Sequence, residues 1–573
     1  MFITQQDFDF ANAYKERSPW SIYYQAVLSL ADRLLEIPAP RVDHSRHNWI
    51  LEQAKCFGRY AITLAGAYRL TGNAAYAGRC CRLIDDALEW ETWYWEDESS
   101  GGYGYDLATG EMAYFFSMLL YLLADRLKPE QRAGICTVLK ERVLDRYLKA
   151  SGDNNRQGKP AHWYTGRTNW NAVCNGGMLC LAFCMAEQCP AYKEVIPRAL
   201  KGLDSYLDAL QEDGSSIEGI GYWSYGVTFM TYALLDYEVY YGKSHPVFER
   251  NVFREGLSFP FDFSPQGAGI SFGDVNHFTP SPLVYRLAQK AGREDLEQEV
   301  TMRLLMEASD FAATGTLSCN FAERELYALL LCKRETALPE PKETAHCKVY
   351  PDNGWMLFAS GALRLSFRSG STDMPHAVKD LNAVQLAKNG TRLLESIVNS
   401  PYTLGWFTPG RELYAENQTT SKNAILINGG GQLYYAAADW HRHGNSVSSD
   451  AQAAYPEYVR NAARTVSADA TEILIKDQIE TEAGAWHEVR YITKGEFIKF
   501  GDGQYKVSCS GEECLMTFQA DCRLEFYTAP LVNSIAGRES ANMLRVVSKE
   551  AVQKSEIRTR LQSEYDPNQN DGK

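Results

Sequence analysis

The segment EGIGYWSYG at residues 218–226 places two phenols, Tyr222 and Tyr225, beside the carboxylate of Glu218 and three glycines. Glycine lets the backbone approach a ligand closely, and a phenol can give or take a proton. The segment follows a turn signal, DGSS at residues 213–216, and separates two helical patterns. Aromatic-rich turns are also common in structural packing, so the segment by itself predicts a binding cleft and no more.

A second group of polar residues opens an apolar helical pattern in GRTNWNAVCNGG, residues 166–177. A single Asn at a helix start is usually a cap. Asn169 and Asn171, which flank Trp170 and follow Arg167, exceed what a cap needs. Amide and guanidinium donors at a helix N-terminus favour a bound carboxylate.

The histidines offer fewer candidates. His376 lies in MPHAVKDLNAVQLAKNGTRLLES, residues 374–396, just before an alternating pattern. A lone His there is most often a surface residue. His441 and His443 form HRH and could bind a metal from one strand face, although a solvated loop is the favoured interpretation. Nucleotide-binding glycine loops, HExxH and CxxC pairs are absent from the sequence.

The elements that must position these residues change character along the chain. From about residue 49 to residue 332 the apolar residues recur at helical spacing. Amphipathic stretches of this kind cover residues 53–70, 75–90, 109–127, 130–150, 171–187 and 195–211. Successive antiparallel helix pairs build a bundle or an α/α toroid with a cleft lined by loops at one end.

The second half alternates between apolar and polar residues, which is typical of half-buried strands. Such runs cover residues 361–370, 472–480, 488–500 and 523–527. A Pro- and Glu-rich stretch precedes them. We therefore predict a helical catalytic domain at 1–335, a linker at 336–346 and an antiparallel β-sandwich domain at 347–573.

Composition narrows the function classes. The formal net charge of −14 argues against a nucleic-acid partner. Aromatic residues make up 12% of the chain, which suits stacking on sugar rings as well as cores. The start lacks a secretory pattern, and the longest apolar run, residues 112–124, is too short to span a bilayer. We therefore expect a cytoplasmic protein without membrane partners, whose 14 cysteines are free, buried thiols.

Taken in order, several segments resemble the heparinase II/III-like family of polysaccharide lyases. The matching pieces are residues 104–116 (GYDLATGEMAYFF), 168–177 and 213–226 in the helical half, and His376, Asp380, Gly390, Arg392 and residues 421–432 (SKNAILINGGGQ) in the β half. The resemblance implies an incomplete α/α toroid followed by antiparallel β-sheets, as the change of period also indicates.

The resemblance also implies a reaction, β-elimination on a uronate-containing oligo- or polysaccharide, without a cofactor. Asn169 matches the residue that neutralises the sugar carboxylate, and Tyr222 matches the phenol that acts as base, acid or both. His376, reaching the cleft from the β half, matches their proton-transfer partner. Tyr225 is the rival phenol.

The remaining candidate residues would bind substrate. Arg167 could assist at the carboxylate and lower the pKa of the catalytic phenol, since a nearby cation favours the phenolate. Asn171 could also contact the carboxylate, and Trp170, Glu218 and Tyr225 complete the predicted substrate-binding set. Trp170 departs from the family pattern, because several members have a His at this position.

Three further departures concern a structural zinc site of some family members. This chain has Val378 and Lys422 where those members have histidines, and Glu395 and Ser396 where an acidic ligand is displaced or absent. Valine cannot ligate and a protonated lysine repels a cation, so we predict no metal. The Lys422 ammonium could fill the space, paired with Glu395 or Asp380.

Two alternatives remain open. One is a glycoside hydrolase on an α/α toroid, for which Asp213, Glu218 and Asp274 are the available carboxylates. The other is a carbohydrate-binding relative without activity.

Overall fold

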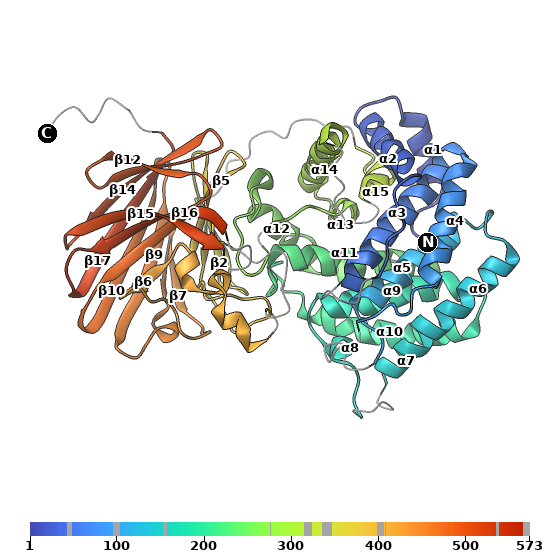
Figure 1. Ribbon diagram of the computed structural model, residues 1–573, viewed down its shortest axis with the longest axis horizontal. Helices are drawn as coiled ribbons and strands as arrows, with labels where there is room; N and C mark the ends of the chain where they lie inside the picture. Colours follow the sequence, from blue (N-terminus) through green and yellow to red (C-terminus); the bar gives the residue numbers. More distant parts are fainter. Residues whose placement is uncertain are drawn as a thin grey trace. The chain divides into compact units, whose positions relative to one another are not determined.

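The computed structural model describes residues 1–42, 49–95, 103–152, 158–275, 277–314, 324–334, 346–397, 406, 408–533 and 538–564. Helices dominate the first part of the chain and antiparallel strands the second (Figure 1). Contacts divide the chain into two compact units, which are described separately. The helical unit comprises Met1–Leu210, Trp223–Leu257 and Thr279–Glu340, and the β unit comprises Gln211–Tyr222, Ser258–Phe278 and Pro341–Lys573.

The amphipathic stretches of the sequence form helices at the expected places. The α-helices of the first part are α1 (Gln5–Tyr14), α2 (Trp20–Leu34), α3 (Trp49–Thr71), α4 (Ala74–Leu88), α5 (Leu107–Leu122), α6 (Pro129–Leu139), α7 (Asp145–Ala150), α8 (His162–Thr165), α9 (Asn169–Met185), α10 (Pro190–Ala209), α11 (Gly219–Tyr241), α12 (Phe259–Asp262), α13 (Pro282–Ala291), α14 (Glu294–Thr314) and α15 (Arg324–Leu331). The stretch predicted as one helix at 130–150 is divided, because a π-helical turn at Lys140–Leu144 separates α6 from α7.

The centre of the helical unit is a stack of helices whose backbones touch. A Cβ atom on Gly177 of α9 would lie 1.9 Å from the carbonyl oxygen of Gly110 on α5. One on Gly176 would lie 2.8 Å from the carbonyl oxygen of Phe229 on α11. Nearly every residue of α5 and α9 is buried. The glycines are therefore required for close helix packing, with α3 and α10 on the outer sides of α5 and α9.

The β unit consists of three antiparallel sheets. Their strand orders are β1-β2-β3-β4-β5, β12-β13-β14-β17-β10-β9-β8-β7 and β15-β16-β11-β6. The strands are β1 (Cys347–Tyr350), β2 (Trp355–Ser360), β3 (Leu363–Arg368), β4 (Val384–Lys388), β5 (Thr391–Leu394), β6 (Ile425–Ile427), β7 (Asp439–His443), β8 (Ser446–Asp450), β9 (Val459–Ala468), β10 (Ile473–Ala485), β11 (His487–Thr493), β12 (Glu496–Gly501), β13 (Gln504–Cys509), β14 (Glu512–Ala520), β15 (Leu524–Asn533), β16 (Arg538–Ser548) and β17 (Val552–Gln562).

One apolar core joins the three sheets. It contains Leu365 of β3, Ile475 of β10 and Val546 of β16, each without exposed surface. Residues of β10 alternate between buried and half-buried positions over most of the strand, as expected for a strand with one face on the core. The β unit is therefore a layered antiparallel structure built around the period-two pattern of the sequence.

Two segments from the helical half group with the β unit instead. In the segment Gln211–Tyr222, the carboxylate of Asp213 accepts from the backbone N–H of Asp352 at 2.9 Å. In the segment Ser258–Phe278, the ring of Phe259 packs on Trp355 of β2 with centroids 5.7 Å apart. From the sequence, both segments were predicted to belong to the helical domain at residues 1–335. Local pattern could not show otherwise, because the contacts that place them in the β unit are long-range. Of the predicted linker at 336–346, all but the last residue lie outside the described residues.

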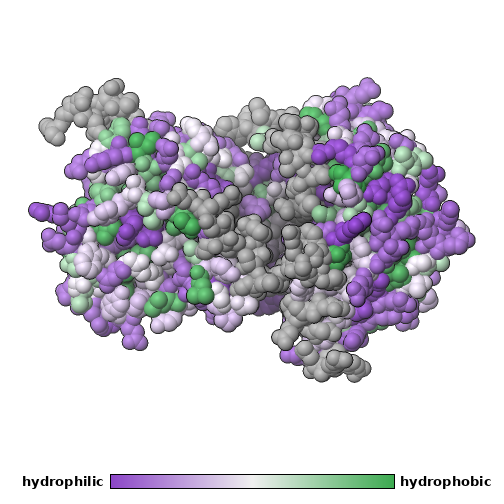
Figure 2. Space-filling view, viewed as in Figure 1, coloured by the Kyte–Doolittle hydropathy of each residue, from purple (hydrophilic) through white to green (hydrophobic). Residues whose placement is uncertain are grey.

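Figure 2 shows hydrophilic residues over most of the coloured surface, with apolar residues scattered between them. Within the described ranges, helices that combine the length and apolar character needed to cross a membrane are absent. The described cysteines are free thiols; Cys80, Cys174, Cys180 and Cys514 are among the buried ones, whereas others, such as Cys136, are only partly buried.

Candidate active site

The segment EGIGYWSYG begins helix α11 and is not a turn. Gly219 has a φ of 81°, a left-handed conformation that favours glycine, and its N–H donates to the carbonyl oxygen of Ser216. A Cβ atom on Gly221 would lie 2.5 Å from Cγ1 of Val275. The glycines therefore bring the start of α11 against the segment Ser258–Phe278, so they serve chain packing inside the β unit.

This packing brings Tyr222 against His376. The imidazole and the phenol ring are stacked, with centroids 3.8 Å apart and planes inclined by 15°. His376 lies in the connection between β3 and β4 with a φ of 60°, and 16% of its side chain is exposed. The two residues are 154 positions apart in sequence, yet both belong to the β unit. Both were candidates in the sequence analysis.

The imidazole of His376 lies between two buried carboxylates. Its Nδ1 is 3.1 Å from Oδ2 of Asp274, and its Nε2 is 3.7 Å from Oε1 of Glu218. Asp274 in turn accepts from Arg411 at 3.0 Å and from the indole N–H of Trp406 at 3.2 Å. From the sequence, Asp274 was a candidate only as a hydrolase carboxylate, and Arg411 and Trp406 were not candidates. Local sequence pattern could not indicate Arg411 and Trp406, because their contact with Asp274 joins positions more than 130 residues apart.

Tyr225 has a different environment, inside the helical unit. Its hydroxyl donates to the carboxylate of Glu111 on α5, and the ammonium of Lys55 lies 4.6 Å from the centroid of its ring. Burial, and then the Glu111 carboxylate, raise the pKa of Tyr225 well above its ordinary value. Burial also raises the pKa of Glu111, against the opposing effect of Lys55. The Tyr225 hydroxyl therefore keeps its proton.

The second candidate group surrounds the start of α9 in the helical unit. Asn169 is the first residue of the helix and is 1% exposed, Arg167 is exposed, and Trp170 packs on His162 with centroids 5.1 Å apart. The amide nitrogen of Asn171 donates to the carbonyl oxygens of Tyr164 and Gly202, each at 2.9 Å. Asn171 thus joins three segments of the helical unit, and its donor hydrogens are used internally.

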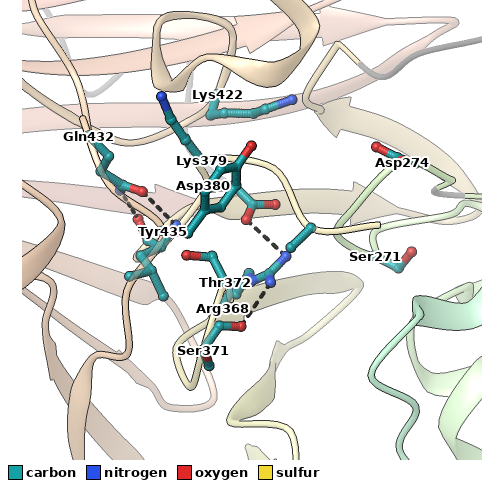
Figure 3. Close-up of polar contacts among 12 residues, drawn as sticks. Ser271, Asp274, Arg368, Ser371, Thr372, Lys379, Asp380, Lys422, Gln432 and Tyr435 are labelled. Atoms are coloured by element: carbon teal, nitrogen blue, oxygen red, sulfur yellow. Dashed lines mark hydrogen bonds and ion pairs between the residues drawn. The ribbon is translucent and has the colours of Figure 1, made fainter. Parts of the chain in front are cut away.

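The positions that resemble a zinc site hold a buried ammonium. Nζ of Lys422 donates to the carbonyl oxygens of Ile397 at 2.6 Å and of Glu416 at 2.8 Å. Burial lowers the pKa of Lys422 to about 8, while the Asp380, Asp274 and Glu416 carboxylates oppose the shift. Figure 3 shows Lys422 and Asp380 in the same cluster.

The carboxylates near Lys422 have other partners. Asp380 forms an ion pair with Arg368 at 2.8 Å (Figure 3). Glu395 lies 3.3 Å from Arg392 and 3.1 Å from Lys494, so the predicted pairing of Lys422 with Glu395 is wrong. The backbone at Ile397 and Glu416 lies next to the Lys422 ammonium, so carbonyl oxygens accept its hydrogen bonds. Valine and an ammonium at the two histidine positions do not fit a metal.

The HRH histidines lie on a strand, so the loop interpretation is wrong. His441 and His443 belong to β7, the edge strand of the eight-stranded sheet, and both are exposed. Over the described part of the chain, groups of three or more His, Cys, Asp or Glu side chains that could hold a metal ion are absent.

Among known proteins, the similarity of this chain is to solved structures and concerns the fold. The sequence matches no protein-family model and no curated protein. Among solved structures, heparinase III aligns over 94% of this chain and 85% of its own, with a TM-score of 0.65 and 13% identity.

Two further structures are similar. A chondroitin AC lyase from Streptomyces coelicolor covers 98% of this chain and 83% of its own, with a TM-score of 0.58 and 12% identity. A heparan sulfate lyase from Pedobacter heparinus covers 94% of this chain and 83% of its own, with a TM-score of 0.56 and 13% identity. The chain therefore has the fold of the heparinase-like polysaccharide lyases, and the predicted helical toroid followed by an antiparallel β domain is confirmed.

Proposed function

We propose that this chain is a polysaccharide lyase that cleaves uronate-containing glycans by β-elimination. The solved structures that share its fold are described as heparinase, heparan sulfate lyase and chondroitin AC lyase. The observation that carries the proposal is the stacked pair of Tyr222 and His376, since an elimination needs one group to take a proton and another to give one.

The proposed reaction is balanced by these two side chains. One removes the proton at C5 of the uronate, and the electron pair left on C5 forms the C4–C5 double bond. The C4–O4 bond breaks, and the other side chain protonates O4. Water is not consumed, and the new end is a 4,5-unsaturated uronate. The enolate-like intermediate carries extra negative charge, so donors to the carboxylate lower the barrier.

The other residues receive roles from the resemblance and from their surroundings. Asn169 donates to the uronate carboxylate, and the exposed Arg167 and the ring of Trp170 bind the sugar chain. Tyr225 contributes its ring to binding, because its hydroxyl is held by Glu111. Asn171 is left out of the binding set, because both of its amide hydrogens bond to backbone carbonyls.

The glycoside-hydrolase alternative is disfavoured by the surroundings of its carboxylates. Both oxygens of Asp213 accept backbone N–H groups, from Ser215 at 2.8 Å and Asp352 at 2.9 Å. Glu218 and Asp274 face opposite nitrogens of His376. An imidazole thus occupies the space where a hydrolase needs the glycosidic bond and its water.

The test is a panel of uronate polymers and short oligomers, including heparan sulfate, chondroitin sulfate and alginate. The expected product absorbs in the ultraviolet because its double bond is conjugated with the carboxylate. New reducing ends without that absorbance would support the hydrolase. Binding without turnover, unchanged by Tyr222→Phe, would support a carbohydrate-binding protein.

A further inference from the structure

Asp274 holds His376 at two points. Its backbone N–H donates to the carbonyl oxygen of His376 at 3.0 Å, and its Oδ2 lies 3.1 Å from Nδ1 of the ring. The neighbouring Gly273 makes this approach possible, because a Cβ atom there would lie 2.9 Å from the same carbonyl oxygen. His376 has a φ of 60°, a conformation that costs a non-glycine residue free energy. One residue therefore anchors both the backbone and the ring.

The Asp274 carboxylate is surrounded by hydrogen-bond donors. Arg411 donates to Oδ1 at 3.0 Å, and the indole N–H of Trp406 donates to Oδ2 at 3.2 Å. The Asp274 side chain has no exposed surface. Arg411 is itself held, since it also donates to the carbonyl oxygen of Ala377 and to Oδ1 of Asn417. A carboxylate in an ion pair with an arginine accepts hydrogen bonds and has no hydrogen to donate.

We infer that Asp274 is a positioning residue that fixes His376 as the Nδ1–H tautomer, so that Nε2 is the nitrogen that exchanges a proton with substrate. This inference rests on the proposed function for the identity of the reaction. Because Oδ2 can only accept, Nδ1 must carry the hydrogen, and the lone pair of the neutral ring is on Nε2.

The surroundings of Nε2 suit this role. Glu218, 3.7 Å from Nε2, is too distant for a hydrogen bond but close enough to stabilise an imidazolium. When Nε2 takes the proton, the positive ring therefore lies between two carboxylates. The charged and titratable groups near the ring include Glu218 just before α11, Tyr222 at its start, Asp274, and Arg411 behind Asp274.

The direct test is nuclear magnetic resonance of the intact chain with isotope-labelled histidine and no substrate. The His376→Gln variant identifies the His376 signals among those of the ten histidines. In the neutral state we expect a protonated Nδ1 and an unprotonated Nε2. A protonated Nε2 with a bare Nδ1 would overturn the inference, whatever the protein does to glycans.

The Asp274→Asn variant tests the cause. The amide can donate to Nδ1 as well as accept from it, so we expect the Nε2–H tautomer to appear and kcat to fall by about 10²–10⁴-fold with KM little changed. The control is Asp262→Asn, which removes a carboxylate paired with Lys348 elsewhere in the β unit and should leave kcat and the His376 signals unchanged. An unchanged His376 tautomer in Asp274→Asn would contradict the inference.

A second variant covers the case in which Asp274→Asn does not fold. Asp274→Ala removes the acceptor that faces Nδ1 without adding an amide donor, and should raise the fraction of the Nε2–H tautomer and lower kcat. If the tautomers behave as expected but no uronate glycan is eliminated, the proposed function fails while the positioning role stands. If elimination occurs and neither variant moves the tautomer, the positioning role fails alone.

Discussion

The phenol ring of Tyr222 lies face to face with the imidazole of His376, with centroids 3.8 Å apart. One ring comes from the start of α11 and the other from the β3–β4 connection, and both lie in the β unit. Both can exchange a proton, whereas the hydroxyl of Tyr225, three positions along the same helix, keeps its proton and donates a hydrogen bond to Glu111. The structure therefore gives different partners to two phenols that share one short sequence segment.

The first prediction concerns these phenols. Tyr222→Phe should lower kcat by about 10²–10⁴-fold, because the ring remains but the exchangeable proton is lost. KM should change little. The measurement is the initial rate of ultraviolet absorbance on the best uronate substrate.

Tyr225→Phe is the matched control. It should retain most of kcat but lower the free energy of unfolding by about 1–3 kcal/mol, because the buried Glu111 carboxylate loses a donor. If Tyr225→Phe abolishes turnover while Tyr222→Phe is active, the two phenols exchange roles.

The second prediction concerns Asn169. Asn169→Ala should lower kcat by about 10²–10³-fold, the cost of losing one donor to a developing negative charge. Asn169→Asp should be at least as inactive, because it places a negative charge against the uronate carboxylate. Circular dichroism must show both variants folded. Full activity in Asn169→Ala would remove this residue from the mechanism.

The third prediction concerns the buried ammonium of Lys422. Lys422→Met should lower the free energy of unfolding by about 3–5 kcal/mol, because two buried backbone carbonyls lose their donor and Asp380 keeps only Arg368 as a nearby cation. Lys494→Met removes a cation that is 55% exposed beside Glu395, and should cost no more than about 1 kcal/mol. Equal losses in urea titrations of the two variants would count against the role of Lys422.

The fourth prediction concerns metal. Because Val378 has no donor atom and Lys422 is an ammonium, a chelator should leave both Tm and the elimination rate unchanged. Elemental analysis of the purified protein should find no stoichiometric transition metal. A bound metal whose removal lowers Tm would show that other residues ligate it.

The fifth prediction is a pH dependence of stability. Burial lowers the pKa of His487 to about 4, and its Nδ1 lies 2.8 Å from the Ser555 hydroxyl. An unfolded histidine titrates near about 6.5, so below that pH the unfolded state binds a proton that the folded state does not. Stability from this residue is complete above about pH 6.5 and falls by about 3 kcal/mol as the pH drops to about 4.

The check for His487 is urea unfolding across that pH range. His487→Gln should flatten the pH dependence of the unfolding free energy, whereas the exposed His443→Gln should leave it unchanged. An identical pH dependence in wild type and His487→Gln would exclude His487 as its source.

Much of the fold could be predicted from local pattern. Residues 171–187 and 195–211 read as helices and form α9 and α10, and residues 472–480 read as a strand and lie in β10. The π turn at Lys140–Leu144 was not predictable, because the apolar spacing continues through it. The glycines of EGIGYWSYG indicated a turn, whereas their packing against Val275 allows them to start a helix.

By itself, the sequence determined the change from helical to strand periodicity and the candidates Tyr222, Asn169 and His376, because residue type and spacing are local properties of the chain. Only the tertiary structure decided three contacts. The Asp274 carboxylate faces Nδ1 of His376, and the Glu111 carboxylate accepts a hydrogen bond from the Tyr225 hydroxyl. The Lys422 ammonium donates to the carbonyl oxygens of Ile397 and Glu416. Each of these contacts joins segments whose approach depends on how helices and sheets pack. No spacing along the chain encodes that approach.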